Sequence, residues 1–249
     1  MIYFVGAGPG DPELITVKGK CLLERADLII YTGSLVNPAL LENVKPGCKI
    51  YDSAGMTLAE VIAVMEAGFG MGEEIVRLHT GDPSLFGAVR EQMDALAGRN
   101  IPYEVVPGVS SFFAAAAALK TEYTLPGVSQ TLILTRMAGR TLVPESESIE
   151  SLAAHQTSMV VFLSIQQMEE LAEKLMKYYP PETPAAVVYK ASWPEEKIIR
   201  GVLDTIAGAV RQENITRTAL LMVGNFLGSE YQLSKLYDPN FSHGYRKDS

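Results

Sequence analysis

The amino-acid sequence predicts an α/β protein of two domains, the first built on a mostly parallel sheet and the second on a mixed sheet. Short apolar runs alternate with helix-like segments through the first half of the chain, which is the pattern of βα units. In the second half, two consecutive strand-like runs flank the segment Trp193–Glu195, which indicates a hairpin. A chain of 249 residues, 47% of them apolar, is long enough to bury two cores of moderate size.

The first domain is predicted to span residues 1–120. A short helix is expected after its second strand, and the other helices are expected at Thr16 to about Arg25, from Thr57 onward, at Phe86–Ala97 and at Ser110–Leu119. The helix from Thr57 starts at a capping-box pattern, because Glu60 follows Thr57 by three residues. The predicted strands are Ile2–Val5, Leu28–Tyr31, Lys49–Tyr51, Glu74–His79 and Tyr103–Val106. Repeated βα units of this kind cover both faces of a parallel sheet with helices.

The second domain is predicted to span residues 121–249. After Lys120 the βα alternation gives way to Pro126, Gly127 and a β-rich run, Gln130–Thr135. A polar segment, Pro144–Glu150, separates its first two predicted strands. Helices are expected from about Gln166 to Tyr178 and from the end of the fourth strand to about Gln212. The predicted strands are Gln130–Thr135, Met159–Leu163, Ala185–Tyr189, Lys197–Leu203 and Ala219–Val223.

Composition excludes several classes of function. A net charge of −8 disfavours nucleic acid as a partner, although arginines gathered in a cleft could still hold a small acidic ligand. No apolar stretch approaches the roughly 20 residues that span a bilayer, and no secretory signal is visible at the start, so a cytoplasmic protein is expected. Two cysteines and three widely separated histidines predict neither a disulfide framework nor a metal site.

The stretch GAGPGD at residues 6–11 raises the question of a dinucleotide site, because a glycine-rich turn follows an apolar run. In the G-x-G-x-x-G fingerprint the third glycine lets the helix pack closely while backbone amides hold a pyrophosphate. Here that third position is Asp11, a carboxylate, and Pro9 removes one amide donor. This spacing argues against a phosphate ligand, and with it against a nicotinamide dehydrogenase or a nucleotide-binding module.

Three turns follow predicted strands directly: the first turn is Gly6–Pro12, the second Thr80–Ser84 and the third Pro107–Ser111. Each alone is compatible with an ordinary tight turn, but three at one edge of a parallel sheet indicate a ligand cleft. None carries Lys or Arg, so a triphosphate would lack counter-charges. Backbone carbonyls, serine hydroxyls and the apolar Leu85 suit a ligand with hydroxyls, a flat purine and a positive centre, such as S-adenosylmethionine.

At these turns the sequence resembles the tetrapyrrole (corrin/porphyrin) methyltransferase family. The matching pieces are VGAGPGDPELITVKG at 5–19, GDPSLFG at 81–87 and VVPGVSSFFAAAAAL at 105–119, and the similarity continues through MVVFLSI and TALLMVG. The resemblance implies two α/β domains that bind folded S-adenosylmethionine in a cleft between them and release S-adenosylhomocysteine. It also implies a homodimer and a small-molecule tetrapyrrole substrate.

Within the family, YTGSLVNPALL at 31–41 and YDSAGMTLAEV at 51–61 resemble the precorrin-4 C11-methyltransferases of cobalamin biosynthesis. The uroporphyrinogen III enzymes are expected to have an aspartate after the second strand and a lysine after the third. Thr32 and Ser53 stand there instead. Methylation of precorrin-4 or cobalt-precorrin-4 at C11 is therefore expected. The alternatives are precorrin-2 C20, precorrin-3B C17 or uroporphyrinogen III methylation, and diphthamide or ribosomal RNA methylation on the same fold.

The resemblance also implies a set of cofactor contacts, which we carry over by position. In the second domain the matches are looser, since Leu163 and Ala191 stand where relatives often have methionine and glycine, and a plain core role is the alternative. The predicted cofactor-binding residues are Pro9, Thr80, Gly81, Asp82, Leu85, Ser110, Ser111, Leu163, Ala191, Ala219 and Leu220.

Methyl transfer from a sulfonium mainly requires alignment of donor and acceptor and exclusion of water. The sequence contains no recognisable His-Asp or paired-carboxylate pattern, and no catalytic base is named. A substrate rich in acetate and propionate groups requires arginines and lysines along its trough. The candidates near the turns and the predicted strand ends are Arg77, Arg90, Lys120, Arg136, Arg140 and Lys190.

Overall fold

The computed structural model describes residues 1–139, 141–238, 241–242 and 244. Contacts divide these residues into two compact units. Unit 1 comprises Met1–Ala115 together with Lys190–Glu196, and unit 2 comprises Ala116–Tyr189 and the chain from Lys197 onward. The division thus falls inside α4 (Ser111–Leu119) and returns one distant loop to unit 1. The ranges 1–120 and 121–249 stay a prediction for the folding domains.

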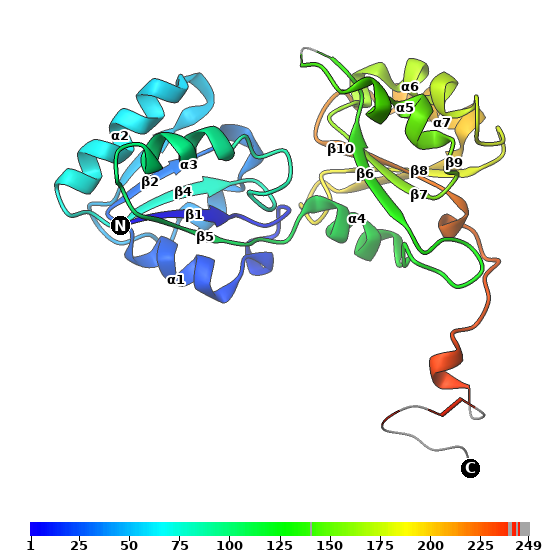
Figure 1. Ribbon diagram of the computed structural model, residues 1–249, viewed down its shortest axis with the longest axis horizontal. Coiled ribbons are helices and arrows are strands. Elements are labelled where there is room, and N and C mark those ends of the chain that lie inside the picture. Colours follow the sequence, from blue (N-terminus) through cyan, green and yellow to red (C-terminus); the bar gives the residue numbers. More distant parts are fainter. Residues whose placement is uncertain (140, 239–240, 243, 245–249) are drawn as a thin grey trace. The chain divides into compact units, whose positions relative to one another are not determined.

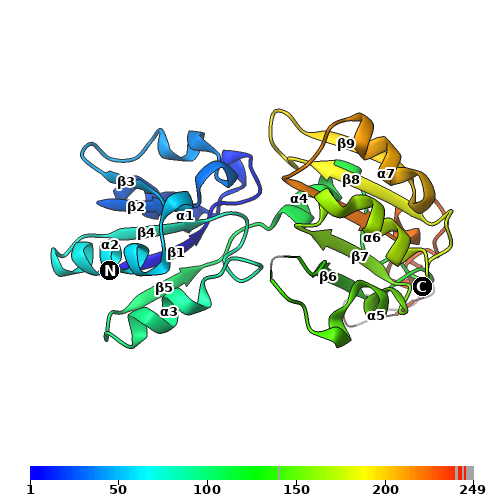
Figure 2. The same ribbon diagram turned by 90° about the horizontal axis from the view of Figure 1, so that it is seen from above.

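Unit 1 is built on a five-stranded sheet in the order β3-β2-β4-β1-β5, and Figure 2 shows these strands side by side. Every pairing in this sheet is parallel, which confirms the predicted arrangement. The four residues of β2 and of β5 were predicted to the residue, because each is a short run of mostly apolar and aromatic residues that a turn follows directly. The strands are β1 (Ile2–Gly6), β2 (Leu28–Tyr31), β3 (Lys49–Asp52), β4 (Ile75–His79) and β5 (Tyr103–Val106).

Helices cover both faces of this sheet (Figure 1): α2 (Leu58–Gly70) and α3 (Arg90–Ala97) lie on one face and α1 (Val17–Arg25) on the other. Alternate strand residues feed the two cores. Phe4 packs with the α2 and α3 side, whereas its neighbour Val5 packs with α1. The predicted capping box is present at the start of α2, with both reciprocal hydrogen bonds formed.

Two predicted helices of unit 1 were wrong in extent. The helix expected at Phe86–Ala97 begins only at Arg90, because Phe86 and Ala88 have φ values of 54° and 47°, outside the right-handed helical region. A side chain at Gly87 would overlap the carbonyl oxygen of Pro83, so this segment folds tightly against the second turn. The short helix expected after β2 is replaced by two 3₁₀ turns, at Gly33–Leu35 and Pro38–Leu41.

Unit 2 contains a five-stranded sheet in the order β6-β7-β10-β8-β9. The β6–β7 pair is parallel and the other three pairs are antiparallel, so the prediction of a mixed sheet is confirmed. The expected hairpin is the β8–β9 pair. The strands are β6 (Leu132–Arg136), β7 (Ser158–Phe162), β8 (Pro184–Tyr189), β9 (Lys197–Val202) and β10 (Ala219–Val223).

The main core of unit 2 lies between this sheet and three helices, α5 (Ile149–Ala153), α6 (Met168–Leu175) and α7 (Leu203–Gln212), which share one face of the sheet (Figure 1). The first of these helices was not predicted, since its first two residues end the polar segment that separates β6 from β7. Toward the other face, the rings of Tyr123 and Phe226 pack together with centroids 5.1 Å apart.

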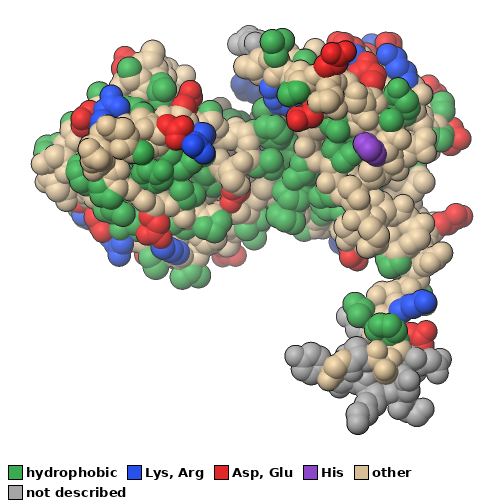
Figure 3. Space-filling view, in the orientation of Figure 1, with side chains coloured by type: hydrophobic (Ala, Val, Ile, Leu, Met, Phe, Trp, Pro, Cys, Tyr) green, Lys and Arg blue, Asp and Glu red, His purple; other side chains and the backbone are tan. Residues whose placement is uncertain are grey.

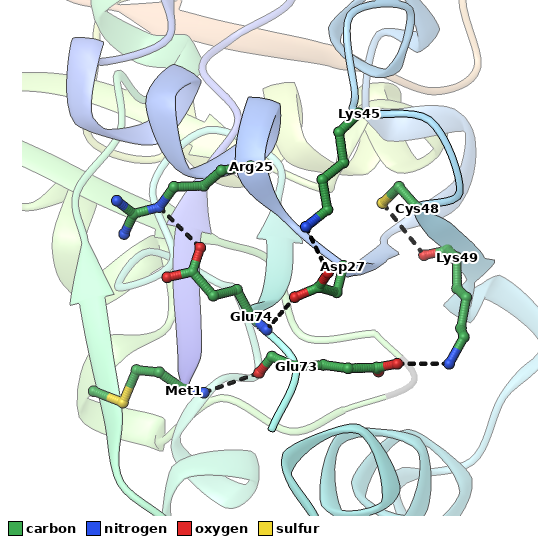
Figure 4. A network of polar contacts seen from close by, with 8 residues as sticks. All are labelled: Met1, Arg25, Asp27, Lys45, Cys48, Lys49, Glu73 and Glu74. Atoms are coloured by element: carbon green, nitrogen blue, oxygen red, sulfur yellow. Dashed lines mark hydrogen bonds and ion pairs between the residues drawn. The ribbon is translucent and has the colours of Figure 1, made fainter. Parts of the chain in front are cut away.

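Charged side chains gather at the amino ends of the unit 1 strands, as Figure 4 shows. Asp27, just before β2, accepts hydrogen bonds from Lys45 Nζ at 2.5 Å and from the Glu74 amide at 2.8 Å. Lys49 Nζ binds Glu73 Oε1 at 2.6 Å. This edge is therefore closed by internal ion pairs. The carboxyl ends of the same strands carry the three turns.

Candidate cofactor site

The three turns meet through their glycines at the carboxyl edge of the unit 1 sheet. A Cβ added to Gly6 would lie 2.5 Å from Gly108 Cα and 2.6 Å from Gly81 O, and one added to Gly108 would overlap the same oxygen. Gly8 and Gly81 exchange backbone hydrogen bonds of 2.9 and 3.2 Å. These approaches are too close for any side chain, so glycine is required where the turns touch.

Four backbone amides in and beside the first turn already donate hydrogen bonds to other groups of the protein. The donating amides and their acceptors are Ala7 (His79 O, 2.7 Å), Gly8 (Gly81 O, 3.2 Å), Asp11 (Ser192 Oγ, 3.0 Å) and Glu13 (Asp11 Oδ1, 2.9 Å). Pro9 has no amide hydrogen to offer. A phosphate bound at a turn needs several amides directed at it, and here these amides are already engaged. The geometry agrees with the expectation that this turn does not bind phosphate.

Asp82 joins the second turn to the third. Its Oδ2 accepts a 2.8 Å hydrogen bond from the amide of Gly108, and its Oδ1 accepts one of 2.8 Å from the amide of Ser84. The Ser84 hydroxyl also donates to Oδ1. Partial burial raises the pKa of the Asp82 carboxyl, but the hydrogen bonds from Ser84 and Gly108 together outweigh it, so the pKa is lowered. Asp82 is thus held as a carboxylate at the centre of the predicted site.

The remaining predicted residues of these turns lie around the same edge. Thr80 Oγ1 lies 3.2 Å from Thr32 Oγ1, at the end of β2. Leu85 is half-buried, and its amide donates a 3.3 Å hydrogen bond to the carbonyl of Asp82. Ser110 is buried and Ser111 is the first residue of α4. The structure therefore brings together the seven predicted residues in and beside the three turns, which are Pro9, Thr80, Gly81, Asp82, Leu85, Ser110 and Ser111.

Two buried polar side chains of β4 support the segment that follows the second turn. Arg77 Nε donates to Gln92 Oε1 at 3.0 Å, and Gln92 Nε2 donates to the carbonyl of Ala88 at 3.1 Å. His79 is buried, and that burial lowers its pKa to about 3, helped by the charge of Arg77 and opposed by a hydrogen bond to the Gly87 backbone. Neutral His79 thus lies directly beneath the second turn.

Three of the predicted residues of the second half, Leu163, Ala219 and Leu220, lie at one edge of the unit 2 sheet. Ala219, the first residue of β10, pairs with Tyr189, the last residue of β8. Ala191 is buried and lies in the loop Lys190–Glu196, whose contacts assign it to unit 1. The β7–β10 register places Leu163 at the end of β7 opposite the start of β10. Leu163 has φ 54° and is 73% exposed, whereas Ala219 and Leu220 are buried. Exposed Leu163 contradicts the alternative that it is a plain core residue.

The basic residues that were candidates for the substrate trough have different surroundings. Arg77 is buried in unit 1 and is not a surface cation. Arg90 is exposed and paired with Asp94 at 2.8 Å. Arg136, the last residue of β6, donates hydrogen bonds to backbone carbonyls of the loop that follows, at 3.1 to 3.2 Å and, for Leu142, at 2.9 Å. Arg140 lies outside the described residues.

Sequence analysis missed three residues that contact the first turn. Asn37 Nδ2 donates to the carbonyl of Gly10 at 2.8 Å. Trp193 Nε1 donates to the carbonyl of Pro9 at 3.0 Å, and Ser192 Oγ accepts from the amide of Asp11 at 3.0 Å. The available signal was that Trp193 is the single tryptophan of the chain and stands in a loop between two strands.

Neither a basic stripe nor a group of metal ligands is found among the described residues. On the face seen in Figure 3, acidic and basic side chains are intermingled on each unit rather than gathered in a basic stripe. Within residues 1–139, 141–238, 241–242 and 244, no group of three His, Cys, Asp or Glu side chains is placed to hold a metal ion. Across the same residues, every helix is too short or too polar to cross a bilayer.

Comparison with known proteins decides the family. The family model described as tetrapyrrole (corrin/porphyrin) methylases matches residues 1–207, which is most of the chain and includes the three turns. The chain belongs to this family. As a tetrapyrrole methylase, it has the parallel and mixed sheets that its sequence predicted, and the family confirms the resemblance read from the turns.

Individual relatives refine the comparison. The cobalt-precorrin-4 C(11)-methyltransferase of Methanocaldococcus jannaschii is 54% identical over 248 residues, which cover 99% of this chain and 96% of the relative. The X-ray structure of a cobalamin biosynthetic enzyme, cobalt precorrin-4 methyltransferase, superposes with a TM-score of 0.90 at 43% identity, covering 92% of this chain and 96% of that one. A uroporphyrin-III C-methyltransferase from Thermus thermophilus, complexed with S-adenosylhomocysteine, superposes at 0.75 with 28% identity, covering 91% and 92%.

Proposed function

We propose that this tetrapyrrole methylase transfers the methyl group of S-adenosylmethionine to C11 of precorrin-4 or cobalt-precorrin-4, in cobalamin biosynthesis. The observation that carries the proposal is the junction of the three turns. Gly6, Gly81 and Gly108 touch there, and the amides of Ala7, Gly8 and Asp11 already donate hydrogen bonds within the protein. Full-length similarity to a cobalt-precorrin-4 C(11)-methyltransferase, at 54% identity, supplies the substrate class and the position methylated.

The residues at this edge suit S-adenosylmethionine. The three turns contain no Lys or Arg, and Asp82 is held as a carboxylate, which favours a ligand with a positive centre. The hydroxyls of Thr80 and Ser111 and the side chain of Leu85 offer polar and apolar contacts for a ribose and a ring. We propose Pro9, Thr80, Gly81, Asp82, Leu85, Ser110, Ser111, Leu163, Ala191, Ala219 and Leu220 as the contacts.

Chemistry at such a site depends on alignment more than on acid and base groups. When bound, S-adenosylmethionine supplies an electrophilic methyl group with a good leaving group. The task of the chain is then to hold donor and acceptor in line and to keep water out. Turns whose glycines lock together through backbone contacts are suited to this, because they hold their shape before the ligand arrives. The nucleophilic carbon belongs to the substrate, so we assign no catalytic base.

Two contacts join the segment that resembles the precorrin-4 enzymes to the proposed cofactor turns. The segment Tyr31–Leu41, which resembles the precorrin-4 enzymes, reaches the proposed cofactor turns at two points. Thr32 lies 3.2 Å from Thr80 through their hydroxyls, and Asn37 binds the Gly10 carbonyl at 2.8 Å. An aspartate at position 32, as expected for uroporphyrinogen III enzymes, would put a second carboxylate beside the second turn. The segment Tyr31–Leu41 thus contacts the proposed cofactor turns directly.

Isotope labelling tests the proposal. The chain is incubated with S-adenosylmethionine carrying ¹³C in its methyl group, in parallel with precorrin-4, cobalt-precorrin-4, precorrin-2, precorrin-3B and uroporphyrinogen III. We expect one new labelled methyl resonance, on C11 of precorrin-4 or its cobalt form. Label at C17 or C20, or transfer only to uroporphyrinogen III, would contradict the proposed position. Absence of transfer to every tetrapyrrole would contradict the function.

We further propose that the chain is a cytoplasmic protein, and that it acts as a homodimer, as membership of the family implies. Sedimentation of the purified protein at micromolar concentration should give a species of twice the 27.1 kDa chain mass. A species of 27.1 kDa at all concentrations would contradict the dimer.

A further inference from the structure

The loop Lys190–Glu196 joins β8 to β9 of unit 2, yet its contacts assign it to unit 1. Lys190 and Ser192 have φ values of 47° and 67°, a left-handed conformation that non-glycine residues adopt rarely and mostly where the surroundings enforce it. The loop is closed by its own hydrogen bonds. The Trp193 amide donates to the Lys190 carbonyl at 3.0 Å, and the Ser192 amide donates to Glu196 Oε2 at 2.7 Å.

This loop contacts the first turn through two consecutive side chains. Trp193 Nε1 donates to the carbonyl of Pro9 at 3.0 Å, and Ser192 Oγ accepts from the amide of Asp11 at 3.0 Å. Between these two bonds, a Cβ at Gly10 would overlap Cδ1 and Nε1 of the indole. The indole edge therefore rests on the Gly10 backbone, and the peptide groups on both sides of Gly10 are fixed by the loop.

The indole is itself held in place. Lys190 Nζ lies 5.0 Å from the centre of the Trp193 ring, within the range of a cation–π contact, and also pairs with Glu195 at 3.5 Å. Asn37 holds the Gly10 carbonyl from a third segment, at 2.8 Å. The path of Pro9, Gly10 and Asp11 is thus set by side chains from distant parts of the chain.

We propose that Trp193 is a positioning residue for the cofactor, which acts by fixing the first turn through the Pro9 carbonyl and the Gly10 backbone. The inference rests on the proposed function, because Pro9 is one of its cofactor contacts. Ser192 has the same role at Asp11. A loop that precedes β9 would in this way fix a turn that follows β1, and Ala191, another proposed contact, lies in the same loop.

The test compares Trp193→Phe, which keeps a ring but removes the N–H donor, with Ser192→Ala, which removes the second bond. Tyr178→Phe is the control, an aromatic substitution at an exposed site outside the loop. S-adenosylhomocysteine binding is measured by calorimetry, KM and kcat with the methyl donor are measured separately, and urea unfolding reports folding. We expect five- to tenfold weaker binding for each variant, about the effect of one lost hydrogen bond, with KM for the donor raised and kcat changed less.

Because Trp193 is the single tryptophan, its fluorescence provides a second, site-specific readout in the wild-type protein. S-adenosylhomocysteine should shift or quench this emission with the dissociation constant found by calorimetry. If the wild type binds the ligand but both variants bind it equally well, or if the emission does not respond, the proposal is overturned and the function stands. If the wild type does not bind the ligand, the proposed function fails and this inference fails with it.

Discussion

Asp82 Oδ2 accepts a 2.8 Å hydrogen bond from the amide of Gly108, a residue 26 positions later in the chain. The carboxylate thereby links the turn after β4 to the turn after β5. Its other oxygen accepts a hydrogen bond from the amide of Ser84. A residue proposed as a cofactor contact therefore also links two turns through the oxygens of its carboxylate.

We predict that Asp82→Ala weakens S-adenosylhomocysteine binding by at least about tenfold, because hydrogen bonds to a charged group are worth about 1.5–3 kcal/mol. Asp82→Asn should lie between the wild type and Asp82→Ala, since its amide oxygen can still accept from Gly108. Asp94→Asn serves as control, because this exposed carboxylate only pairs with Arg90. Calorimetric binding of Asp82→Ala equal to that of the wild type would contradict a role for Asp82 in the site.

Gly108→Ala should destabilise the protein by at least about 2 kcal/mol, because its methyl group would overlap the carbonyl oxygen of Gly81 and the backbone must move. Gly70→Ala is the matched control: it lies at the end of α2 with no atom within 4 Å of the new Cβ. That substitution should be neutral or stabilise by about 0.5–1 kcal/mol. Urea unfolding measures both, and equal stability of the two variants would refute the tight junction of the turns.

Buried His79 should make the protein sensitive to acid. Its pKa is about 3 in the folded chain against 6.5 for an ordinary histidine, so between these values the unfolded chain binds more protons. Its contribution to stability is complete above pH 6.5 and falls as the pH decreases, by at most about 1.4 kcal/mol per pH unit. His79→Gln should flatten the dependence of unfolding free energy on pH between 6 and 4.5. Exposed His155→Gln is the control substitution, and a slope for His79→Gln identical to that of the wild type would contradict this assignment.

Arg136→Ala should weaken tetrapyrrole binding about tenfold and change S-adenosylhomocysteine affinity less than about twofold. Arg136 ends β6 beside Phe162, at the same sheet edge as Leu163 and Ala219, and its guanidinium shapes the loop that follows. Arg211→Ala is the control, an exposed arginine of α7 paired with Glu169 at 3.4 Å. Separate titrations with substrate and with S-adenosylhomocysteine decide the matter, and equal loss of both would count against a role in the trough.

Local patterns in the sequence were sufficient for most of the fold. The start of α2 follows from Thr57 and Glu60, whose reciprocal hydrogen bonds depend only on residues three positions apart. The strands β2 and β10 are short apolar runs bounded by polar residues, so periodicity and composition locate them. The three turns were recognised because glycine and proline follow strands directly, and the structure joins them through those glycines.

Features that depend on distant contacts could not be predicted in this way. The segment from Phe86 was predicted as helix from its local sequence. In the structure Gly87 packs against the Pro83 carbonyl, and α3 starts only at Arg90. Trp193 was interpreted as part of a hairpin loop, because nothing nearby in the sequence indicates that its indole contacts Pro9, 184 residues earlier. Tertiary structure decides such positions, and local propensity does not.

A crystal structure with S-adenosylhomocysteine tests the central claim most directly. The account predicts that the ligand lies against Thr80–Leu85 and Ser110–Ser111, with no anion held by the amides of residues 6–11. Ligand density away from these turns, or a nucleotide phosphate bound by the first turn, would contradict it.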